Sequence, residues 1–254
     1  MISWLLALSF LGSCAAGPIS RLVDRIDRRA SGWLLALVPA GLFAAFVSLA
    51  PEIEAGRTVT GRVSWAPSLG VDLTLRLDGF SLLFALLITG IGALVIVYAG
   101  AYMSEEPGRG RARFFTQLLL FMTAMLGAVL SDNLLVFYFF WESTSVLSFL
   151  LIGFHAESPH ARRAALMSLR VTAGGGLALL GAIILIGVTL DSYSMVEAIA
   201  RAWELAESRW SGLIVAGLFL GVFTKSAQFP FHFWLPNAMQ APTPASAYLH
   251  SATM

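Results

Sequence analysis

The chain has 254 residues, of which 57% are hydrophobic and only 12% are charged. A soluble domain carries about 25% charged residues, so this composition excludes an ordinary soluble protein. It predicts an all-α, multi-pass helix bundle in a membrane. The formal net charge of +1 gives no basis for nucleic-acid binding.

Apolar runs of about 20 residues, the length that spans a bilayer, predict seven transmembrane helices and the start of an eighth. The runs are Ile2–Ala16, Trp33–Ala50, Gly79–Met103, Phe114–Leu130, Leu134–Phe154, Ala165–Leu190 and a segment from about Trp210, with the eighth starting near Ala245. Within the long connection Pro51–Leu77, the alternation of Asp72–Leu77 is typical of a small hairpin outside the bilayer. Asp191–Arg209 is predicted to form an interfacial helix, with an apolar side made of Val196, Ile199, Ala200 and Trp203.

The basic residues of the connections predict an orientation. The connections after the first, third and fifth runs are short and hold four, three and two arginines. Those after the second, fourth and sixth hold three, none and two, mostly in longer segments. Because positive residues favour the cytoplasmic side, the N-terminus is expected outside and the basic loop Arg109–Arg113 inside.

One charged residue, Lys225, lies inside the seventh apolar run. Pro230 and His232 follow it closely, and Pro236, Pro242 and Pro244 come next, so we predict that the seventh helix is broken near Pro230. A charge at the bilayer centre costs about 2.5–3.5 kcal/mol on insertion scales and is read by default as functional. The structural alternative is a fixed buried salt bridge.

Glu142 is the natural partner for this lysine. It lies eight residues into its run, about 12 Å deep at 1.5 Å per residue. Thr144 and Ser145 could hydrogen-bond its carboxylate. At roughly 6–10 Å and an effective dielectric near 20, the attraction between Glu142 and Lys225 would be about 1.7–2.8 kcal/mol. Such a pair could load and release a proton, or Glu142 could simply join two helices.

The remaining polar residues allow two interpretations each. His232 and His250 could relay protons near neutral pH, or each could be a packing residue. Asp132 fits a solvated turn better than a site. Arg170, five residues into the sixth run, could reach the cytoplasmic surface or face inward. Gly174–Gly176 indicates close helix packing rather than a phosphate loop.

The sequence contains no metal-ligand cluster, nucleotide loop or nucleophile motif. No metal, cofactor or enzymatic activity is therefore expected. A series of Glu, Lys and His residues in a membrane bundle is instead typical of a proton or cation path.

Two long motifs resemble a known family. The segment from Leu130 through Phe140-Trp-Glu-Ser-Thr-Ser, and the segment Thr224–Met254, are similar to the fifth and the seventh-to-eighth helices of the proton-pumping membrane subunits of complex I and their antiporter relatives. Phe229-Pro-Phe-His, together with the flanks of the fifth run, most resembles the A subunits of the Mrp-type multisubunit Na+/H+ antiporters. The likeness covers Phe114–Met254 strongly and the first three runs loosely.

The resemblance implies roles for several residues. Glu142, Lys225 and His250 match the family's fifth-helix glutamate, seventh-helix lysine and eighth-helix histidine, and His232 matches a histidine of the antiporter branch. Where many members carry a helix-six lysine, this sequence has Met167, with Arg170 one turn later.

The resemblance also implies a domain organisation. Residues 1–113 would be N-terminal helices, and 114–254 would be the first five-helix antiporter repeat, incomplete at its end because the chain is a fragment of a longer protein. Neither assignment follows from composition or spacing alone.

Three functions follow as alternatives. The first is a Na+/H+ antiporter subunit in a hetero-oligomeric complex of the bacterial plasma membrane. The second is a proton-pumping membrane subunit of a respiratory or hydrogenase-type complex. The third is a membrane scaffold, in which the buried charges could be replaced without loss of transport.

Overall fold

The computed structural model describes residues 1–24, 27–28, 30–66 and 71–252. Arg25 and Arg29 of the first basic connection, residues 67–70 and the final Thr253 and Met254 lie outside this part. Within it, six helices are long and apolar enough to cross a membrane. They are α1 (Ile2–Val23), α2 (Ala30–Glu54), α3 (Gly79–Tyr102), α4 (Gly108–Leu130), α5 (Leu134–Ile152) and α6 (Pro159–Leu190).

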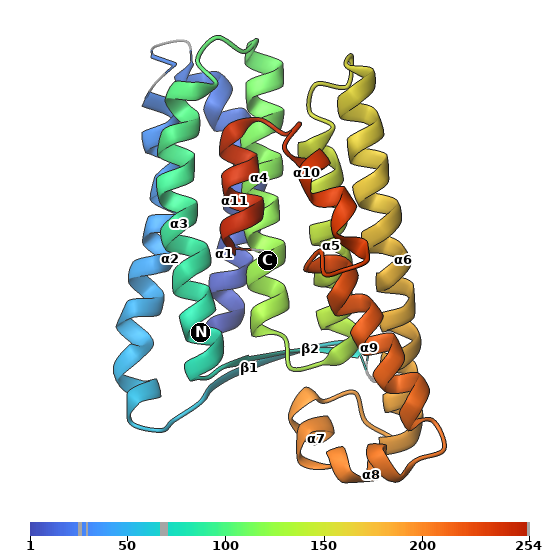
Figure 1. The fold of residues 1–254 in the computed structure, drawn as a ribbon. Coiled ribbons are helices and arrows are strands. Elements are labelled where there is room, and N and C mark those ends of the chain that lie inside the picture. The colour runs from blue at the N-terminus through green and yellow to red at the C-terminus, as the bar shows by residue number, and fades with distance from the viewer. Residues whose placement is uncertain (25–26, 29, 67–70, 253–254) are drawn as a thin grey trace.

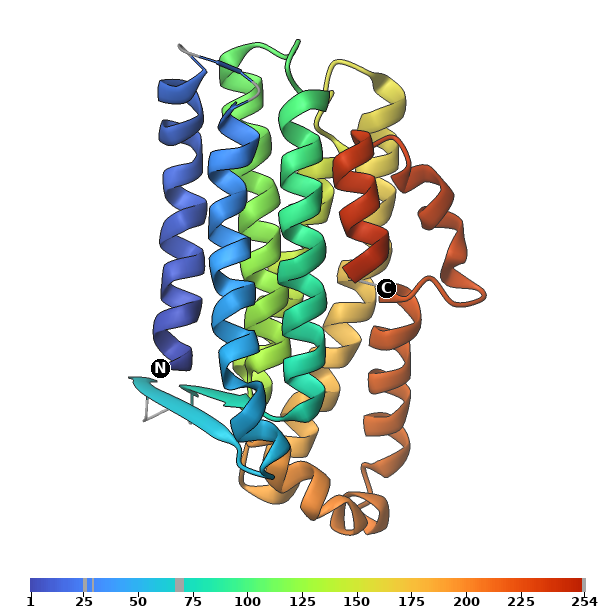
Figure 2. The same ribbon diagram turned by 90° about the vertical axis from the view of Figure 1, so that its left-hand side faces the viewer.

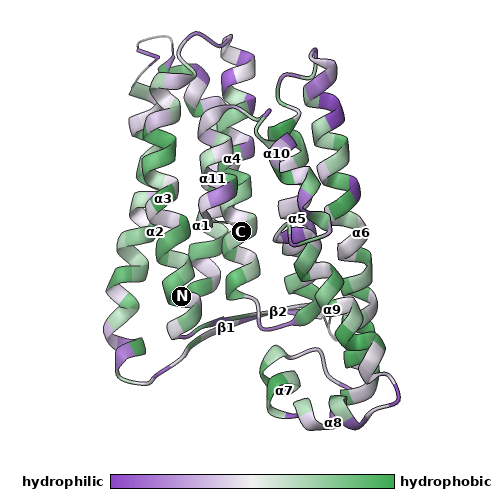
Figure 3. Cartoon of the chain, in the orientation of Figure 1, coloured by the Kyte–Doolittle hydropathy of each residue, from purple (hydrophilic) through white to green (hydrophobic). Residues whose placement is uncertain are grey.

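The long helices run side by side (Figures 1 and 2), which confirms the predicted all-α bundle. Hydrophobic residues predominate along them, and hydrophilic residues gather towards the two ends (Figure 3). The connections after α1, α3 and α5 share one end of the bundle, here called the basic end. The N-terminus lies at the opposite end (Figure 1).

The interior of the bundle is organised around α4. Its fully buried side chains include Phe114, Phe115, Phe121 and Met122, and it packs against α1, α3 and α5. A second apolar cluster joins α5, α6 and α9 (Ser211–Lys225), the shorter helix that corresponds to the predicted seventh run.

Several predicted helix ends were wrong. The first helix continues through Gly17 to Val23, α4 begins at Gly108, and α6 begins at Pro159. The arginines predicted in the third and fifth connections therefore lie in the first two turns of α4 and α6. The predicted domain boundary at 113/114 falls inside α4. Hydropathy marks only the part of a helix that lies in hydrocarbon, whereas caps mark its ends: at α6 the Ser158 side chain accepts a bond from Ala161 N, and Pro159 occupies the first turn.

The predicted hairpin is confirmed at the end opposite the basic end (Figure 1). Strands β1 (Val59–Ala66) and β2 (Val71–Leu77) pair antiparallel. The alternation of β2 buries Leu75 and Leu77 against the bundle. A further bridge joins Leu75 to Ser131 in the α4–α5 turn, so the hairpin is fixed to the turn that precedes α5.

The predicted interfacial helix is instead two short helices, α7 (Met195–Ala200) and α8 (Ala202–Glu207), separated at Arg201. Both lie beyond the hairpin end of the bundle (Figure 1). Val196, Ile199, Ala200 and Trp203 of the predicted apolar side are exposed, but the first three belong to α7 and Trp203 belongs to α8.

The break after α9 begins earlier than predicted. The helix ends at Lys225, five residues before Pro230. Ala227 adopts a left-handed conformation (φ 51°), and Gln228 N donates to Phe223 O at 2.9 Å, the arrangement that ends many helices. The short elements η2 (Phe231–Phe233) and α10 (Trp234–Ala238) then lead to α11 (Thr243–Ala252).

Candidate functional site

Lys225 is the last residue of α9 and the one lysine of the sequence. A cation is favoured at this position because the helix macrodipole is negative at its C-terminus. The indole of Trp234 caps the same helix end, donating from Nε1 to Thr224 O at 2.9 Å. The lysine side chain extends from this broken end towards α5.

Three oxygens of α5 accept hydrogen bonds from the Lys225 Nζ. They belong to Thr144 (Oγ1, 2.6 Å), Ser145 (Oγ, 2.8 Å) and the carbonyl of Trp141 (3.3 Å). The Trp141 ring also lies 5.3 Å from Nζ, measured to its centroid, within cation–π range. Because an ammonium has three N–H donors, this lysine cradle of Trp141, Thr144 and Ser145 satisfies all of them with neutral groups.

Glu142 does not form a direct ion pair with Lys225; among the described residues the ammonium bonds to the cradle instead. The carboxylate lies against Gly176 of α6, where an added Cβ would collide with Oε1, and the neighbouring Gly175 leaves room for Thr224. The predicted packing role is confirmed for these two glycines. Glu142 Oε1 is buried without a hydrogen-bond partner in the described part of the chain.

A large cavity of about 880 Å³ reaches the cradle from the hairpin end. At the hairpin end its lining includes Asp78, Asp132 and Val196, and deeper in the bundle it includes Thr144 and Lys225. Most of its other lining residues are apolar, from α3, α4, α5 and α7.

A small cavity of about 20 Å³ also borders Lys225. It is lined by polar and apolar groups together: Ser145, Ser148, Ser168, Thr172, Lys225, Trp234, Ala238, Leu249 and His250. A cavity needs about 10–15 Å³ to hold one water, and that water needs polar partners. This cavity therefore suits a single water between Lys225 and His250.

The structure does not bring every predicted residue to this site. His232 is exposed and stacks on Phe229, with ring centroids 5.9 Å apart, and it lines neither cavity. Arg170 is exposed on α6 rather than turned into the bundle. Among the described residues, no three His, Cys, Asp or Glu side chains are placed to hold a metal ion.

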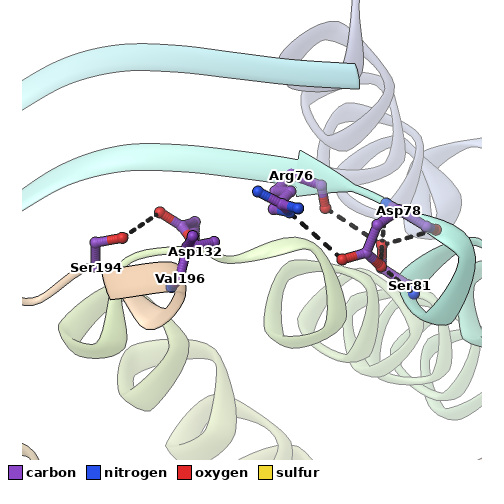
Figure 4. Close-up of polar contacts among 6 residues, drawn as sticks. All are labelled: Arg76, Asp78, Ser81, Asp132, Ser194 and Val196. Atoms are coloured by element: carbon purple, nitrogen blue, oxygen red, sulfur yellow. Dashed lines mark hydrogen bonds and ion pairs between the residues drawn. The ribbon is translucent and has the colours of Figure 1, made fainter. Parts of the chain in front are cut away.

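Asp132 was predicted to be a solvated turn residue, and that prediction was wrong. Its carboxylate accepts from Ser194 Oγ at 3.0 Å and from Val196 N at 3.3 Å (Figure 4). Its backbone joins Thr74 of the hairpin and Met195 of α7, at 2.9 and 2.6 Å. Asp132 thus ties the hairpin, the α4–α5 turn and α7 together just before α5 begins.

A second carboxylate at this end caps α3. Asp78 accepts from Ser81 N and Oγ at 3.0 and 2.9 Å, and from Arg76 Nε at 3.4 Å (Figure 4). Partial burial raises the pKa of the Asp78 carboxyl, but the hydrogen bonds from Ser81 and Arg76 outweigh burial and leave that pKa below its usual value.

Sequence reasoning missed the partners of the lysine. Thr144 and Ser145 were expected to bond the carboxylate of Glu142, yet they bind the ammonium of Lys225. The available signal was the helical spacing, because Trp141, Thr144 and Ser145 follow an i, i+3, i+4 pattern that places them on one face of α5.

The comparisons with known proteins identify the family of the chain. The family described as "NADH:quinone oxidoreductase/Mrp antiporter, TM" matches residues 131–254, and the family described as "NADH-Ubiquinone oxidoreductase (complex I), chain 5 N-terminus" matches residues 64–115. Together they cover more than half of the chain. The chain belongs to the NADH:quinone oxidoreductase/Mrp antiporter family.

Similar proteins in this family include antiporter subunits. The chain is 51% identical to the A1 subunit of a Na+/H+ antiporter of Staphylococcus haemolyticus, over 88% of this chain and 28% of that protein. It is 44% identical to the A/B subunit of a probable K+/H+ antiporter of Rhizobium meliloti, over 98% of this chain and 25% of that protein. The chain thus spans about a quarter of the length of these relatives.

Two solved structures extend the likeness to the fold. The Mrp complex from Dietzia sp. DQ12-45-1b matches all of this chain and 26% of the solved chain, with a TM-score of 0.85 and 35% identity. The archaeal membrane-bound sulfane sulfur reductase matches 96% of this chain and 37% of the solved one, with a TM-score of 0.78 and 22% identity, a likeness of fold alone. The chain is a multi-pass membrane protein of this fold.

Proposed function

We propose that the chain is part of one subunit of a monovalent cation/proton antiporter, in which Lys225 is the proton-binding group. The observation that carries the proposal is the position of the ammonium, which lies at a helix break between a large and a small cavity. Irregular backbone at membrane depth is tolerated within protein or along a water-filled path, and transporter folds place their sites at such breaks. The names of the antiporter relatives support the same function.

Glu142 and His250 complete the proposed path. Glu142 lies beside the cradle on α5, with one carboxylate oxygen buried and unpartnered in the described part of the chain, so its charge acts on Lys225 through the bundle interior. His250 borders the small cavity on the side of α11. Protonated Lys225 would be stabilised by the cradle and by the charge of Glu142, and it would release its proton towards His250.

The proposal assigns His232, Arg170 and Asp132 smaller roles. His232 lies outside both cavities, Arg170 faces outwards, and Asp132 holds the hairpin end together. Residues 114–254 would correspond to the first antiporter repeat and 1–113 to the helices before it. Other subunits of a hetero-oligomeric complex would be the partners, and Na+ and H+ the transported ions.

Antiport in everted membrane vesicles tests the proposal. Lys225→Ala and Glu142→Ala are expected to abolish Na+-dependent proton exchange while the protein still inserts, which an immunoblot of the membranes would check. Arg163→Ala and Glu157→Ala, exposed charges at the basic end, serve as matched controls and are expected to keep exchange. Full exchange in either buried-charge variant would refute the assignment.

A proton-pumping subunit of a redox-driven complex is the second candidate, because both matched families are named after NADH oxidoreductases. Its membrane chemistry would be the same. Neighbouring genes for small Mrp-type membrane subunits would favour antiport, whereas genes for iron–sulfur or NADH-binding subunits would favour the redox complex.

We also propose that the chain lies in the bacterial plasma membrane with the basic end in the cytoplasm and the N-terminus outside. The shared position of the three short basic connections supports this orientation. Single cysteines placed at Glu105, in the α3–α4 connection, and at Arg57, before β1, would report it once Cys14, the one native cysteine, is replaced by serine. Only the cysteine at Arg57 should react with a membrane-impermeant thiol reagent in intact cells.

A further inference from the structure

The two hydroxyls of the lysine cradle face different cavities. Thr144 lines the large cavity but not the small one, and Ser145 lines the small cavity but not the large one. Both are almost fully buried, at 4% and 2% exposure, and both contact Nζ of Lys225. The ammonium therefore has one hydroxyl on each side.

The two hydroxyls also differ in what their own protons can do. Thr144 Oγ1 donates to the carbonyl of Trp141 at 2.7 Å, so its single proton is held by its own helix and its oxygen can only accept from Lys225. Ser145 Oγ lies 3.5 Å from the same carbonyl, at the limit of a hydrogen bond. Its hydroxyl proton can therefore turn into the small cavity while its oxygen accepts from Lys225.

From this asymmetry we infer that Thr144 is a positioning residue that anchors the ammonium, whereas Ser145 is the residue that passes the proton from Lys225 into the small cavity. The inference rests on the proposed function. In the transfer, one N–H bond of Lys225 breaks and Ser145 Oγ gains that proton. The Ser145 O–H proton moves to a water in the cavity, and that water passes a proton to the imidazole of His250. Lys225 ends neutral, His250 ends cationic, and Ser145 and the water are unchanged.

Neighbouring groups support a directed transfer. Ser148 and Thr172, which also line the small cavity, donate to Thr144 O at 2.7 Å and to Ser168 O at 2.9 Å. Their protons are therefore committed to their own helices, and their oxygens are left to accept from a cavity water. Ser145 is the cavity hydroxyl that both touches the ammonium and has a weakly held proton.

Double-mutant cycles distinguish the two roles. The antiport rate would be measured in everted vesicles for Ser145→Ala, Thr144→Val and His250→Ala, alone and combined, with the protein expressed from its native gene cluster. A hydrogen bond to a charged group is worth about 1.5–3 kcal/mol, so each cradle variant should slow exchange by roughly 10- to 100-fold. Ser145→Ala should cause no further loss in the His250→Ala background, whereas the loss from Thr144→Val should multiply with it.

Controls separate transfer from packing. Ser145→Thr keeps the hydroxyl and should restore most of the rate, and Ser145→Cys keeps the volume with a weaker donor and should not. Ser143→Ala removes a hydroxyl of the same helix that lines neither cavity and should be neutral. If Ser145→Ala does not insert, Ser145→Cys replaces it in the cycle.

Two failures have different meanings. The division of roles between Thr144 and Ser145 would be overturned if the losses from Ser145→Ala and His250→Ala multiply, or if Ser145→Ala keeps the wild-type rate. In both cases Lys225→Ala would still be inactive. Exchange that survives Lys225→Ala would instead overturn the proposed function.

Discussion

Two cations inside this bundle are held in opposite ways. Arg111, in the first turn of α4, has a fully buried side chain, lies 3.6 Å from Asp24 and donates to Ser31 Oγ and to the carbonyls of Arg28 and Gly100. Lys225, at the end of α9, is held by neutral oxygens of one helix and borders two cavities.

The difference separates a structural charge from an exchangeable one. The groups around Arg111 come from α2, α3 and the connection between α1 and α2, and a guanidinium stays charged at every relevant pH. Arg111 therefore fixes the geometry of the basic end and lines neither of the two cavities. The ammonium of Lys225 is satisfied by neutral oxygens and borders space for water, so it can lose its proton without breaking a direct ion pair.

The largest expected effect on stability is that of Arg111→Ala. Removing one partner of a buried ion pair costs about 3–5 kcal/mol because the other charge remains uncompensated. Here Asp24 would lose its ion-pair partner, and two backbone carbonyls would lose their donor. Thermal unfolding in detergent should therefore show a large fall in the free energy of unfolding. Arg109→Ala, an exposed arginine of the same turn, is the control and should stay within about 0.5 kcal/mol of wild type. If Arg111→Ala and Arg109→Ala proved equally stable, Arg111 would not be the structural charge that distinguishes it from Lys225.

The next largest effect on stability is expected from Asp132→Ala. Asp132 is a hydrogen-bonded carboxylate at the more exposed hairpin end. Its carboxylate accepts two hydrogen bonds from the start of α7, and bonds to a charged group are worth about 1.5–3 kcal/mol. We expect the free energy of unfolding to fall by an amount near the lower limit of this range. Amide hydrogen exchange should become faster only in Ser194–Ala200 and in the α4–α5 turn. Glu207→Ala, an exposed acidic residue of the same α6–α9 connection, is the control. Exchange that rises evenly over all helices would contradict a local tie.

These elements also show how far the sequence could predict the structure. The order of the helices, the hairpin and the shared end of the short basic connections follow from apolar runs, alternation and arginine counts. The beginning of α4 does not, because Arg109, Arg111 and Arg113 look like a loop until the folded chain provides Arg111 with partners from α2, α3 and the α1–α2 connection. Asp132 looked solvated because Ser194, its partner, lies 62 residues away along the chain.

The sequence predicted which residues belong to the candidate site better than it predicted which of them are in contact. Glu142, Lys225 and His250 are visible as isolated polar residues in apolar runs. Which α5 groups meet the lysine depends on the rotation of α5 against α9 and on the end of α9 at Lys225. That end is followed by Ala227, a left-handed alanine that no residue preference indicates. Helical spacing alone could have suggested that Thr144 and Ser145 lie on the same face of α5 as Trp141 rather than on the face of Glu142.

A smaller effect is expected from the cap of α3. Because the pKa of the Asp78 carboxyl is lowered in the folded chain, its contribution is complete above the usual value of 3.8 and is lost as the pH falls through the lowered pKa. The cap is worth about 1 kcal/mol. The unfolding temperature of the wild type should therefore fall more than that of Asp78→Asn between pH 7 and the acid range. Parallel pH profiles of the two proteins would show that the cap does not depend on charge.

The smallest expected change in stability is that of Lys225→Met, and it completes the comparison with Arg111. Methionine keeps the length of the side chain, and replacing a buried charge by an apolar group of similar volume is often neutral or stabilising. The hydroxyls of Thr144 and Ser145 can still bond to their own helix, and the substitution breaks no direct ion pair because Lys225 Nζ bonds to neutral oxygens. We expect unfolding within about 1 kcal/mol of wild type, together with complete loss of antiport. A destabilisation as large as that of Arg111→Ala would mean that Lys225 is a structural charge as well, and that both cations hold the bundle together.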